Sequence, residues 1–298
     1  MILPHQKHSL REIFSIRFNS SIKFITLILF LVLNTSIYSN DEENSRFEFL
    51  RLTNEALQTP VYYLTNKEKT INLKLIGIIH IADPIYYKAI QKISKEVDIL
   101  YFEGVKMHNK QSSIFYPKEF SYLAQSNQIN EQIKQELKLF NNTQSIVGRL
   151  FNLANQEEHL IPDKHWVNAD ISLEELMLIM STKTINYSEI ESSLSLELKS
   201  SPEFMNEKNN KRKFARSILK STEELCYNEK LKPLREALIE ERNRIAISLV
   251  KEKMNTTEIL DLGILYGSAH LPHFLSSLKK DNFSIYYVEW LDAWSFKN

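Results

Sequence analysis

The sequence predicts an α/β fold whose mainly parallel sheet is built from two βαβ units, and two observations lead to this prediction. The chain has 298 residues but only five glycines, and two of them open the matched phrases Gly77-x-x-His80 and Gly267-x-x-His270. Each phrase follows an apolar, strand-like run and precedes a helical pattern and a further strand that contains a glutamate. A right-handed crossover makes the two strands of such a unit parallel and brings their carboxyl ends to one edge of the sheet.

The first unit begins with residues 73–76, which are apolar enough for a mostly buried strand. After His80, Asp83 is a suitable N-cap residue and Pro84 suits the first helical position. Apolar side chains then recur at helical spacing, at Tyr86, Ile90, Ile93 and Val97. Residues 98–104 return as a second strand, which places Glu103 near its end.

The middle of the chain, from about residue 110 to 256, is expected to form a helical insertion. Ser172 and Glu175 have the spacing of a capping box that opens one helix. A long helix is expected over residues 231–254, and Arg242 lies on its apolar stripe between Leu238 and Ile245. The guanidinium should therefore point toward the core and need an anionic partner, for which the glutamates of the sheet are candidates. The alternative is an arginine at the edge of the stripe whose charge reaches water.

The second unit repeats the order of the first near the C-terminus. Its first strand is expected over residues 259–266, and Pro272 follows the second phrase. One helical face then carries Leu271, Phe274, Leu275 and Leu278. The closing strand covers residues 284–289 and ends with Glu289. Two histidines and one or two carboxylates should therefore meet at the sheet edge where open α/β folds bind ligands.

These residue types suit a metal centre. Imidazole and carboxylate ligands from His80, Glu103 and His270 fit a divalent ion such as Mn, Co, Zn or Fe, and three protein ligands leave one position open. Such an ion polarises a carbonyl group and lowers the pKa of water, which favours amide or ester hydrolysis. Glu103 can be a ligand or the general base, and Glu289 is a spare candidate for either role. Arg242 can stabilise an oxyanion or orient a carboxylate.

The order of these motifs resembles that of a known family. Gly77-x-x-His80, Glu103-Gly104, Glu241-Arg242-Asn243 and Gly267-x-x-His270 are together similar to the TraB/PrgY/GumN family, which is related to the Tiki proteases and more remotely to the erythromycin esterases. Residues 168–171 also resemble a family segment. Over residues 73–290 the resemblance implies a divalent-metal-dependent hydrolase that cleaves peptides or proteins, with the two histidines and Glu103 as its metal site and Arg242 as an electrostatic stabiliser. His273 departs from the family pattern, because many members carry glycine at this position.

Other interpretations of the same residues stay open. A histidine that follows a strand is often a hydrogen-bonded structural residue, and both glycines could serve tight turns. Asp170 could only shape the turn before Ser172, whereas His273 lies close enough to His270 to join the site. The same cleft could also belong to a protein that binds a metal, haem or a peptide without catalysis.

Composition excludes several other classes of function. The 37 basic and 37 acidic residues cancel, so nucleic acid is not an expected partner. Cys226 is the only cysteine, which excludes an intrachain disulfide and a thiolate metal site. The sequence has no His-Glu-x-x-His, no Gly-x-Ser-x-Gly and no glycine-rich phosphate loop. With 43% hydrophobic and 25% charged residues, the chain is an ordinary globular protein able to bury a core.

The first forty residues differ from the rest. Basic residues precede an apolar run over residues 24–33, and small polar and acidic residues follow it. This order is typical of an export signal, with cleavage near Ser39, or of an uncleaved membrane anchor. Residues 1–40 are therefore expected to direct export to a periplasmic, secreted or outward-facing membrane-anchored location. Residues 41–298 should form a single domain, with its sheet core at about 60–106 and 258–298.

Overall fold

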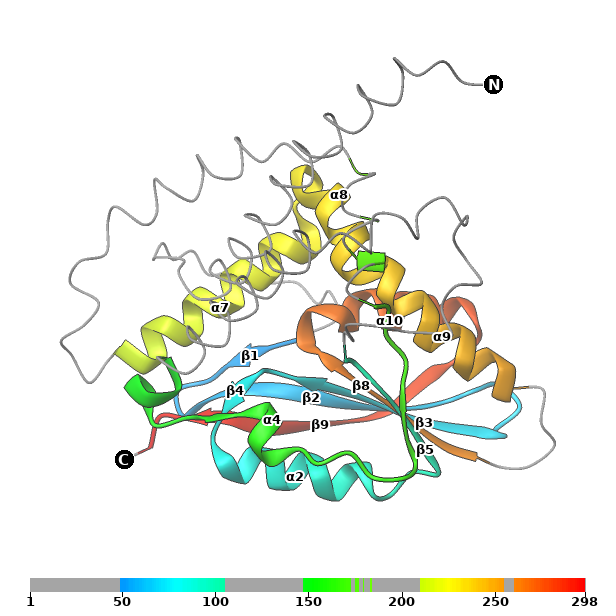
Figure 1. The fold of residues 1–298 in the computed structure, drawn as a ribbon, viewed down its shortest axis with the longest axis horizontal. Coiled ribbons are helices and arrows are strands. Elements are labelled where there is room, and N and C mark those ends of the chain that lie inside the picture. The colour runs from blue at the N-terminus through cyan, green and yellow to red at the C-terminus, as the bar shows by residue number, and fades with distance from the viewer. Residues whose placement is uncertain are drawn as a thin grey trace, which may run out of the picture.

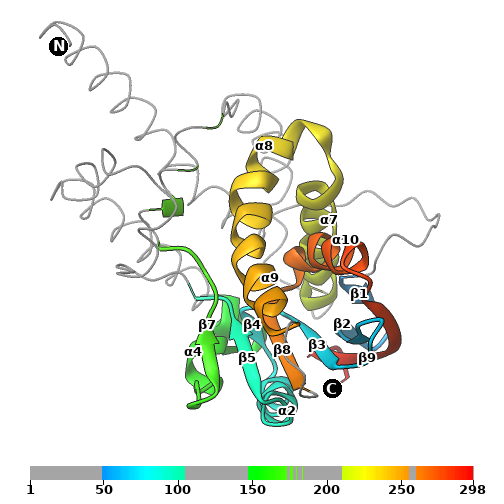
Figure 2. The same ribbon diagram turned by 90° about the vertical axis from the view of Figure 1, so that its right-hand side faces the viewer.

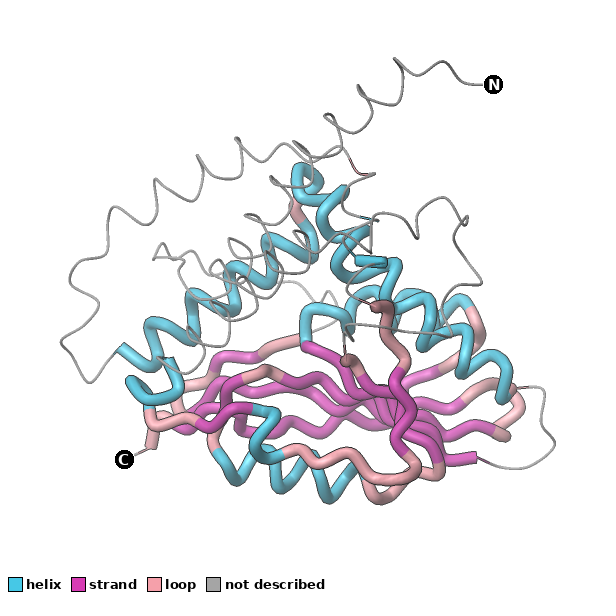
Figure 3. Tube along the Cα trace, in the orientation of Figure 1, coloured by secondary structure: helices cyan, strands magenta, loops and turns pink. Residues whose placement is uncertain are grey.

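The computed structural model describes residues 49–104, 147–172, 175, 176, 179, 183, 210–254 and 260–297. One sheet lies between helices on both of its faces, so the predicted α/β class is confirmed (Figure 1). Helix α2 covers one face, and helices α7, α9 and α10 cover the other (Figures 1 and 2). The bounds of these four helices are Pro84–Ser94, Asn210–Tyr227, Glu241–Lys253 and Leu271–Lys280, respectively. The strands of the large sheet form a layer between them (Figure 3).

The sheet is mixed, with a parallel half and an antiparallel half. Strands β3, β8, β5 and β7 are neighbours in that order and run parallel; they cover Ile71–Ile78, Leu260–Gly267, Ile99–Phe102 and Trp166–Asn168. On the other side, β2 (Ala56–Thr65) pairs antiparallel with β3, with β9 (Ser284–Ser295) and with the short β1 (Arg51–Leu52). A small second sheet joins β4 (Ile81–Ala82) to β6 (Ala154–Asn155).

The prediction of a mainly parallel sheet did not include the antiparallel half, which has a local cause in the sequence. A short turn joins β2 to β3, and the Asn66 side chain holds this turn because its Oδ1 accepts hydrogen bonds from the backbone N–H groups of Thr70 and Ile71, both at 2.9 Å. Strands connected by so short a turn must run antiparallel. Strand β9 pairs with β2 and not with β8, so β2 and β3 lie between β9 and β8 in the sheet.

The insertion is not purely helical within the described residues, because it also supplies strand β7 to the sheet and β6 to the small sheet. A short helix α4 (Gln156–His159) follows β6 directly. The predicted capping box is confirmed: Glu175 Oε2 accepts from the Ser172 N–H at 2.8 Å, and Ser172 Oγ accepts from the Glu175 N–H at 3.2 Å.

The long helix predicted over residues 231–254 has several parts. A 3-10 turn η4 (Glu229–Leu231) and helix α8 (Lys232–Arg235) lead into a π-helical stretch η5 (Glu236–Glu240), which runs directly into α9. The wider π turn changes which side chains face inward. Arg242 is buried as expected, but its buried neighbours are Ala237, Asn243 and Ala246 rather than Leu238 and Ile245.

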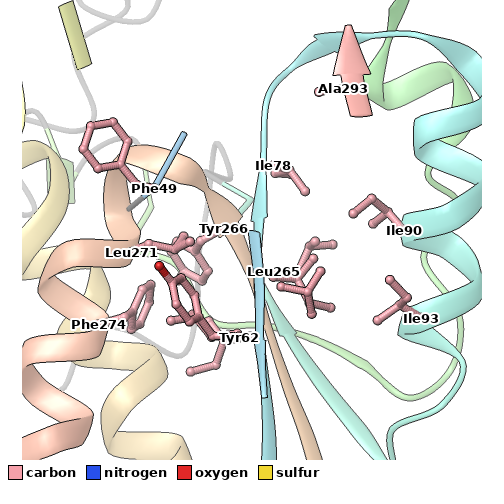
Figure 4. Close-up of a cluster of buried hydrophobic side chains, with 14 of the residues drawn as sticks. Phe49, Tyr62, Ile78, Ile90, Ile93, Leu265, Tyr266, Leu271, Phe274 and Ala293 are labelled. Atoms are coloured by element: carbon pink, nitrogen blue, oxygen red, sulfur yellow. The ribbon is translucent and has the colours of Figure 1, made fainter. Parts of the chain in front are cut away.

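The hydrophobic core lies on both faces of the sheet. On the α2 face, Ile90 and Ile93 approach Ile78 and Leu265, and on the opposite face Leu271 and Phe274 pack near Tyr266 and Tyr62 (Figure 4). Leu265 and Tyr266 point to opposite faces because side chains alternate along a strand.

The two Gly-x-x-His phrases lie side by side, since Gly77 pairs with Tyr266 and Ile78 with Gly267. Ser268 Oγ donates to the Ile78 carbonyl at 3.1 Å. A Cβ on Gly77 would lie only 2.8 Å from Leu271 Cδ2, so the first glycine makes room for the start of α10. Its role in the fold is close packing rather than an unusual backbone angle.

The segment at residues 1–40 and the expected cleavage near Ser39 lie outside the described residues. None of the helices in the described ranges combines the length and the apolar character that a membrane span needs.

We expect Gly77→Ala to destabilise the protein, because the new methyl group collides with the fully buried Leu271. Overpacking of this kind costs about 1–3 kcal/mol. Urea unfolding would measure the loss. Leu271→Ala removes the colliding group, so the double variant Gly77→Ala/Leu271→Ala should be more stable than the sum of the two single changes implies. Simple additivity would contradict the proposed contact.

Candidate functional site

The candidate site lies at the carboxyl ends of the four parallel strands. Strand β3 leads to His80, β5 to Glu103, β7 to Asp170 and β8 to His270. The connection after β3 enters α2 on one face, whereas the connection after β8 enters α10 on the other (Figures 1 and 4). Neighbouring strands whose connections leave in opposite directions mark the point where open α/β sheets bind ligands.

Arg242 ties two of these strand ends together. Its Nε donates to Asp170 Oδ1 at 2.9 Å and its Nη2 donates to Asp170 Oδ2 at 2.7 Å, which makes a two-point ion pair. The same Nη2 donates to Glu103 Oε1 at 2.6 Å, and Nη1 donates to the Leu238 carbonyl at 3.2 Å. The side chain of Asp170 is 0% exposed and that of Arg242 is 10% exposed, so this is a buried ionic cluster.

Backbone N–H groups complete the binding of both carboxylates. Gly267 donates to Glu103 Oε2 at 2.6 Å, while Gly104 donates to Asp170 Oδ2 at 3.1 Å and Ile171 donates to Asp170 Oδ1 at 2.8 Å. A Cβ on Gly267 would lie 3.2 Å from Glu103 Oε2, closer than ordinary van der Waals contact. The glycine of the second phrase therefore lets the backbone approach the carboxylate.

The environment keeps these groups in defined charge states. Burial alone would raise the pKa of Glu103, but the Arg242 guanidinium, helped by His270 and His80, holds that pKa well below its usual range. Burial lowers the pKa of His270 to about 4, although the Glu103 carboxylate acts in the opposite direction. At neutral pH the carboxylate of Glu103 is therefore ionised and the imidazole of His270 is neutral.

His270 faces Glu103 and is held from behind by Asn243. The distance between His270 Nε2 and Glu103 Oε1 is 3.6 Å. On the other side of the ring, His270 Nδ1 and Asn243 Oδ1 are 2.6 Å apart. The Tyr266 ring lies beside the imidazole, with 5.2 Å between ring centroids, and the Tyr266 hydroxyl donates to the Ala169 carbonyl.

His80 lies at the same sheet edge but is exposed. Its Nδ1 is 3.0 Å from Gln156 Oε1, and the Gln156 backbone N–H donates to the His80 carbonyl at 2.8 Å. The proximity of its imidazole is one of the smaller causes of the lowered pKa of Glu103. Within the described part of the chain, no three His, Cys, Asp or Glu side chains are already arranged around a common metal position.

The structure thus brings three of the four predicted site residues, Glu103, Arg242 and His270, into direct proximity, with His80 at the rim. Glu289, the spare candidate, lies elsewhere: on β9 it accepts a hydrogen bond from the Tyr63 hydroxyl at 2.8 Å. It is separated from β8 by β2 and β3, because the closing strand joins the far side of the sheet.

Two residues matter more than the sequence patterns indicated. Asp170 looked like a turn-shaping residue, yet it is the main partner of Arg242. Asn243 is named above only as part of the Glu241-Arg242-Asn243 motif and has no predicted role, although it directly follows the buried arginine and is itself 0% exposed. A polar residue next to a buried charge on the same helix is a signal that could have found it. Asn243 also connects His273 to the site, since its Nδ2 lies 3.1 Å from His273 Nδ1.

The pair His270 and Glu103 fits two ligands of one metal ion. Zinc, for example, takes histidine nitrogen and carboxylate oxygen at about 2.0–2.2 Å, so two ligands of the same ion lie at most about 4.4 Å apart. The 3.6 Å separation between Nε2 and Oε1 meets this condition. A complete site would need His80 to turn from Gln156 toward the pair.

The chain matches no protein-family model, no curated protein and no solved structure, so the assignment of this site rests on its own geometry.

We expect Arg242→Met to lower the free energy of unfolding by about 3–5 kcal/mol, because it leaves the carboxylate of Asp170 buried without its ionic partner. Arg244 is the matched control: it lies on the same helix, is 63% exposed and pairs with Glu241, so Arg244→Met should cost about 1 kcal/mol or less. Urea unfolding measures both changes.

Adding Asp170→Asn to the Arg242→Met variant should recover part of the loss, since the buried negative charge is then gone. Equal stability of the Arg242→Met and Arg244→Met proteins would show that the ionic cluster is not important for the fold.

Proposed function

We propose that the protein is a divalent-metal-dependent hydrolase that acts on peptides or proteins, as the resemblance to the TraB/PrgY/GumN family implies, and that residues 1–40 direct it out of the cytoplasm. The observation that carries the proposal is the buried pair formed by His270 and Glu103, 3.6 Å apart at the carboxyl ends of parallel strands. His270, Glu103 and His80 would hold the ion.

The charge of the cluster supports a cation at this place. Asp170 and Glu103 supply two negative charges, Arg242 supplies one positive charge, and His270 is neutral at pH 7 because burial lowers its pKa to about 4. These four groups therefore carry a surplus of one negative charge in a largely desolvated position. An uncompensated buried charge is costly, and a bound divalent ion would compensate it.

The carboxylate of Glu103 retains the capacity to bind an ion. Each carboxylate oxygen has two lone pairs, and Oε1 accepts one hydrogen bond, from Arg242. The Gly267 N–H holds the other oxygen. Glu103 is thus fixed in orientation, and Oε1, 3.6 Å from His270 Nε2, keeps acceptor capacity beyond its bond from Arg242, which favours the role of ligand over that of a mobile general base.

Arg242 is better suited to positioning than to oxyanion binding. A guanidinium has five N–H groups, and four hydrogen bonds of Arg242 go to Asp170, Glu103 and the Leu238 carbonyl. Its planar fork is thus committed to the two carboxylates. We infer that Arg242 holds Glu103 in place, with Asp170 as the anchor of the arginine.

A bound ion would supply Lewis-acid polarisation of the scissile carbonyl and a lower pKa for the attacking water. The chain itself contributes the fixed orientation of Glu103 and His270 and the surplus negative charge that attracts the cation.

We expect the purified protein to cleave unstructured peptides, to lose this activity on treatment with a chelator and to regain it with Mn²⁺ or Co²⁺. His270→Gln and Glu103→Gln should each reduce turnover by more than the roughly 10- to 100-fold that loss of an outer hydrogen-bond partner costs at metal sites. His165→Gln is the control, since His165 Nε2 contacts the Ser94 carbonyl, away from the site. Peptide cleavage assays with and without added metal make the comparison.

Tight metal binding without any turnover would instead favour a protein that binds a metal or a peptide without catalysis. Turnover that is insensitive to chelator and unaffected by both substitutions would contradict the proposed centre.

The location is proposed from residues 1–40, whose basic, apolar and polar regions follow the order of an export signal. We expect the intact chain outside the cytoplasm or on the outer face of the membrane, and a chain that lacks these residues inside it. Cell fractionation with immunodetection distinguishes the two. An intact chain that stays soluble in the cytoplasm would refute export.

A further inference from the structure

We propose that Asn243 is a positioning residue that keeps the proton of His270 on Nδ1, so that the Nε2 lone pair is directed at Glu103. The hydrogen bonds of Asn243 carry this inference, and its catalytic meaning rests on the proposed metal centre. The state of the imidazole can nevertheless be measured independently of any activity.

The orientation of the Asn243 amide follows from one partner that can only accept. The amide atom 3.0 Å from the backbone carbonyl of His270 must be the donor Nδ2, because a carbonyl oxygen has no proton to give. The other amide atom, Oδ1, then faces His270 Nδ1 at 2.6 Å. Since Oδ1 can only accept, the proton between the two atoms belongs to Nδ1.

A second histidine is the partner of the other N–H group of the amide. The remaining N–H of Asn243 Nδ2 points to His273 Nδ1 at 3.1 Å, so His273 accepts there and, when neutral, carries its proton on Nε2. The two histidines should therefore be opposite tautomers. Asn243 is 0% exposed, and rotation of its amide would break three hydrogen bonds at a buried position, which fixes this arrangement.

The consequence appears on the other side of the His270 ring. With the proton on Nδ1, the Nε2 lone pair meets the Oε1 lone pair of an ionised carboxylate at 3.6 Å. Two facing acceptors favour a cation between them. Without Asn243, the neutral ring would instead carry its proton on Nε2 and donate it to Glu103, which would close the place to a metal ion.

The test is a two-bond ¹H–¹⁵N correlation spectrum of the full chain with ¹⁵N-labelled histidine, recorded at neutral pH after treatment with chelator. His270→Gln and His273→Gln assign the two sets of signals. We expect Nδ1–H for His270 and Nε2–H for His273 in the parent protein. Asn243→Ala should move the His270 proton to Nε2, while Asn243→Asp, which keeps an acceptor opposite Nδ1, should retain Nδ1–H. Asn72→Ala, at a surface contact with Asp261, should change neither histidine.

An Nε2–H form of His270 in the parent protein would overturn the inference, even if the Asn243 variants fail to fold. So would an unchanged Nδ1–H form in a folded Asn243→Ala protein. Addition of Zn²⁺ then separates this inference from the proposed function. A shift of the His270 Nε2 signal with Nδ1–H retained supports both, whereas the expected tautomers without any response to Zn²⁺ would leave Asn243 as a positioning residue and refute the metal centre.

Discussion

The buried pairing of Arg242 with Asp170 and Glu103 is the interaction on which the rest of the site depends. Asp170 follows β7, Glu103 follows β5 and Arg242 comes from α9, so one guanidinium joins two neighbouring strand ends to the helical layer. Two carboxylates need more compensation than one arginine supplies. Backbone N–H groups of Gly104 and Gly267 provide part of it. The remaining negative charge is the reason for proposing that a cation binds between Glu103 and His270.

This arrangement explains local features that are otherwise unusual. The π-helical stretch η5 runs directly into α9, on which Arg242 and Asn243 are both buried, and the Leu238 carbonyl within η5 accepts from Arg242. Glycine suits position 267 because a Cβ there would lie 3.2 Å from Glu103 Oε2, so the carboxylate would have to shift slightly. Gly77, at the matching position of the first phrase, serves packing against Leu271 instead. The two phrases are alike in sequence but differ in physical role.

Much of the fold could be predicted from the sequence, because strand, helix and capping signals are local. The α/β class, the strand that leads to each histidine, the capping box at Ser172 and the burial of Arg242 follow from such patterns. The antiparallel half could not be predicted in this way, because β9 pairs with β2, which is more than 200 residues away in the sequence. Asp170 was underestimated because β7 is only three residues long and lies inside a segment dominated by helical patterns. Asn243 lies outside the predicted apolar stripe of its helix, so that stripe gives no sign of its burial.

The position between His270 and Glu103 can be examined most directly by anomalous X-ray diffraction from crystals of the protein grown with Mn²⁺ or Zn²⁺. A single strong anomalous peak within bonding distance of His270 Nε2 and Glu103 Oε1, with the His80 ring turned toward it, is the expected result. A peak at some other place on the protein, or no peak at saturating metal while the His270 and Glu103 side chains stay well ordered, would contradict the assignment of this pair as a metal site.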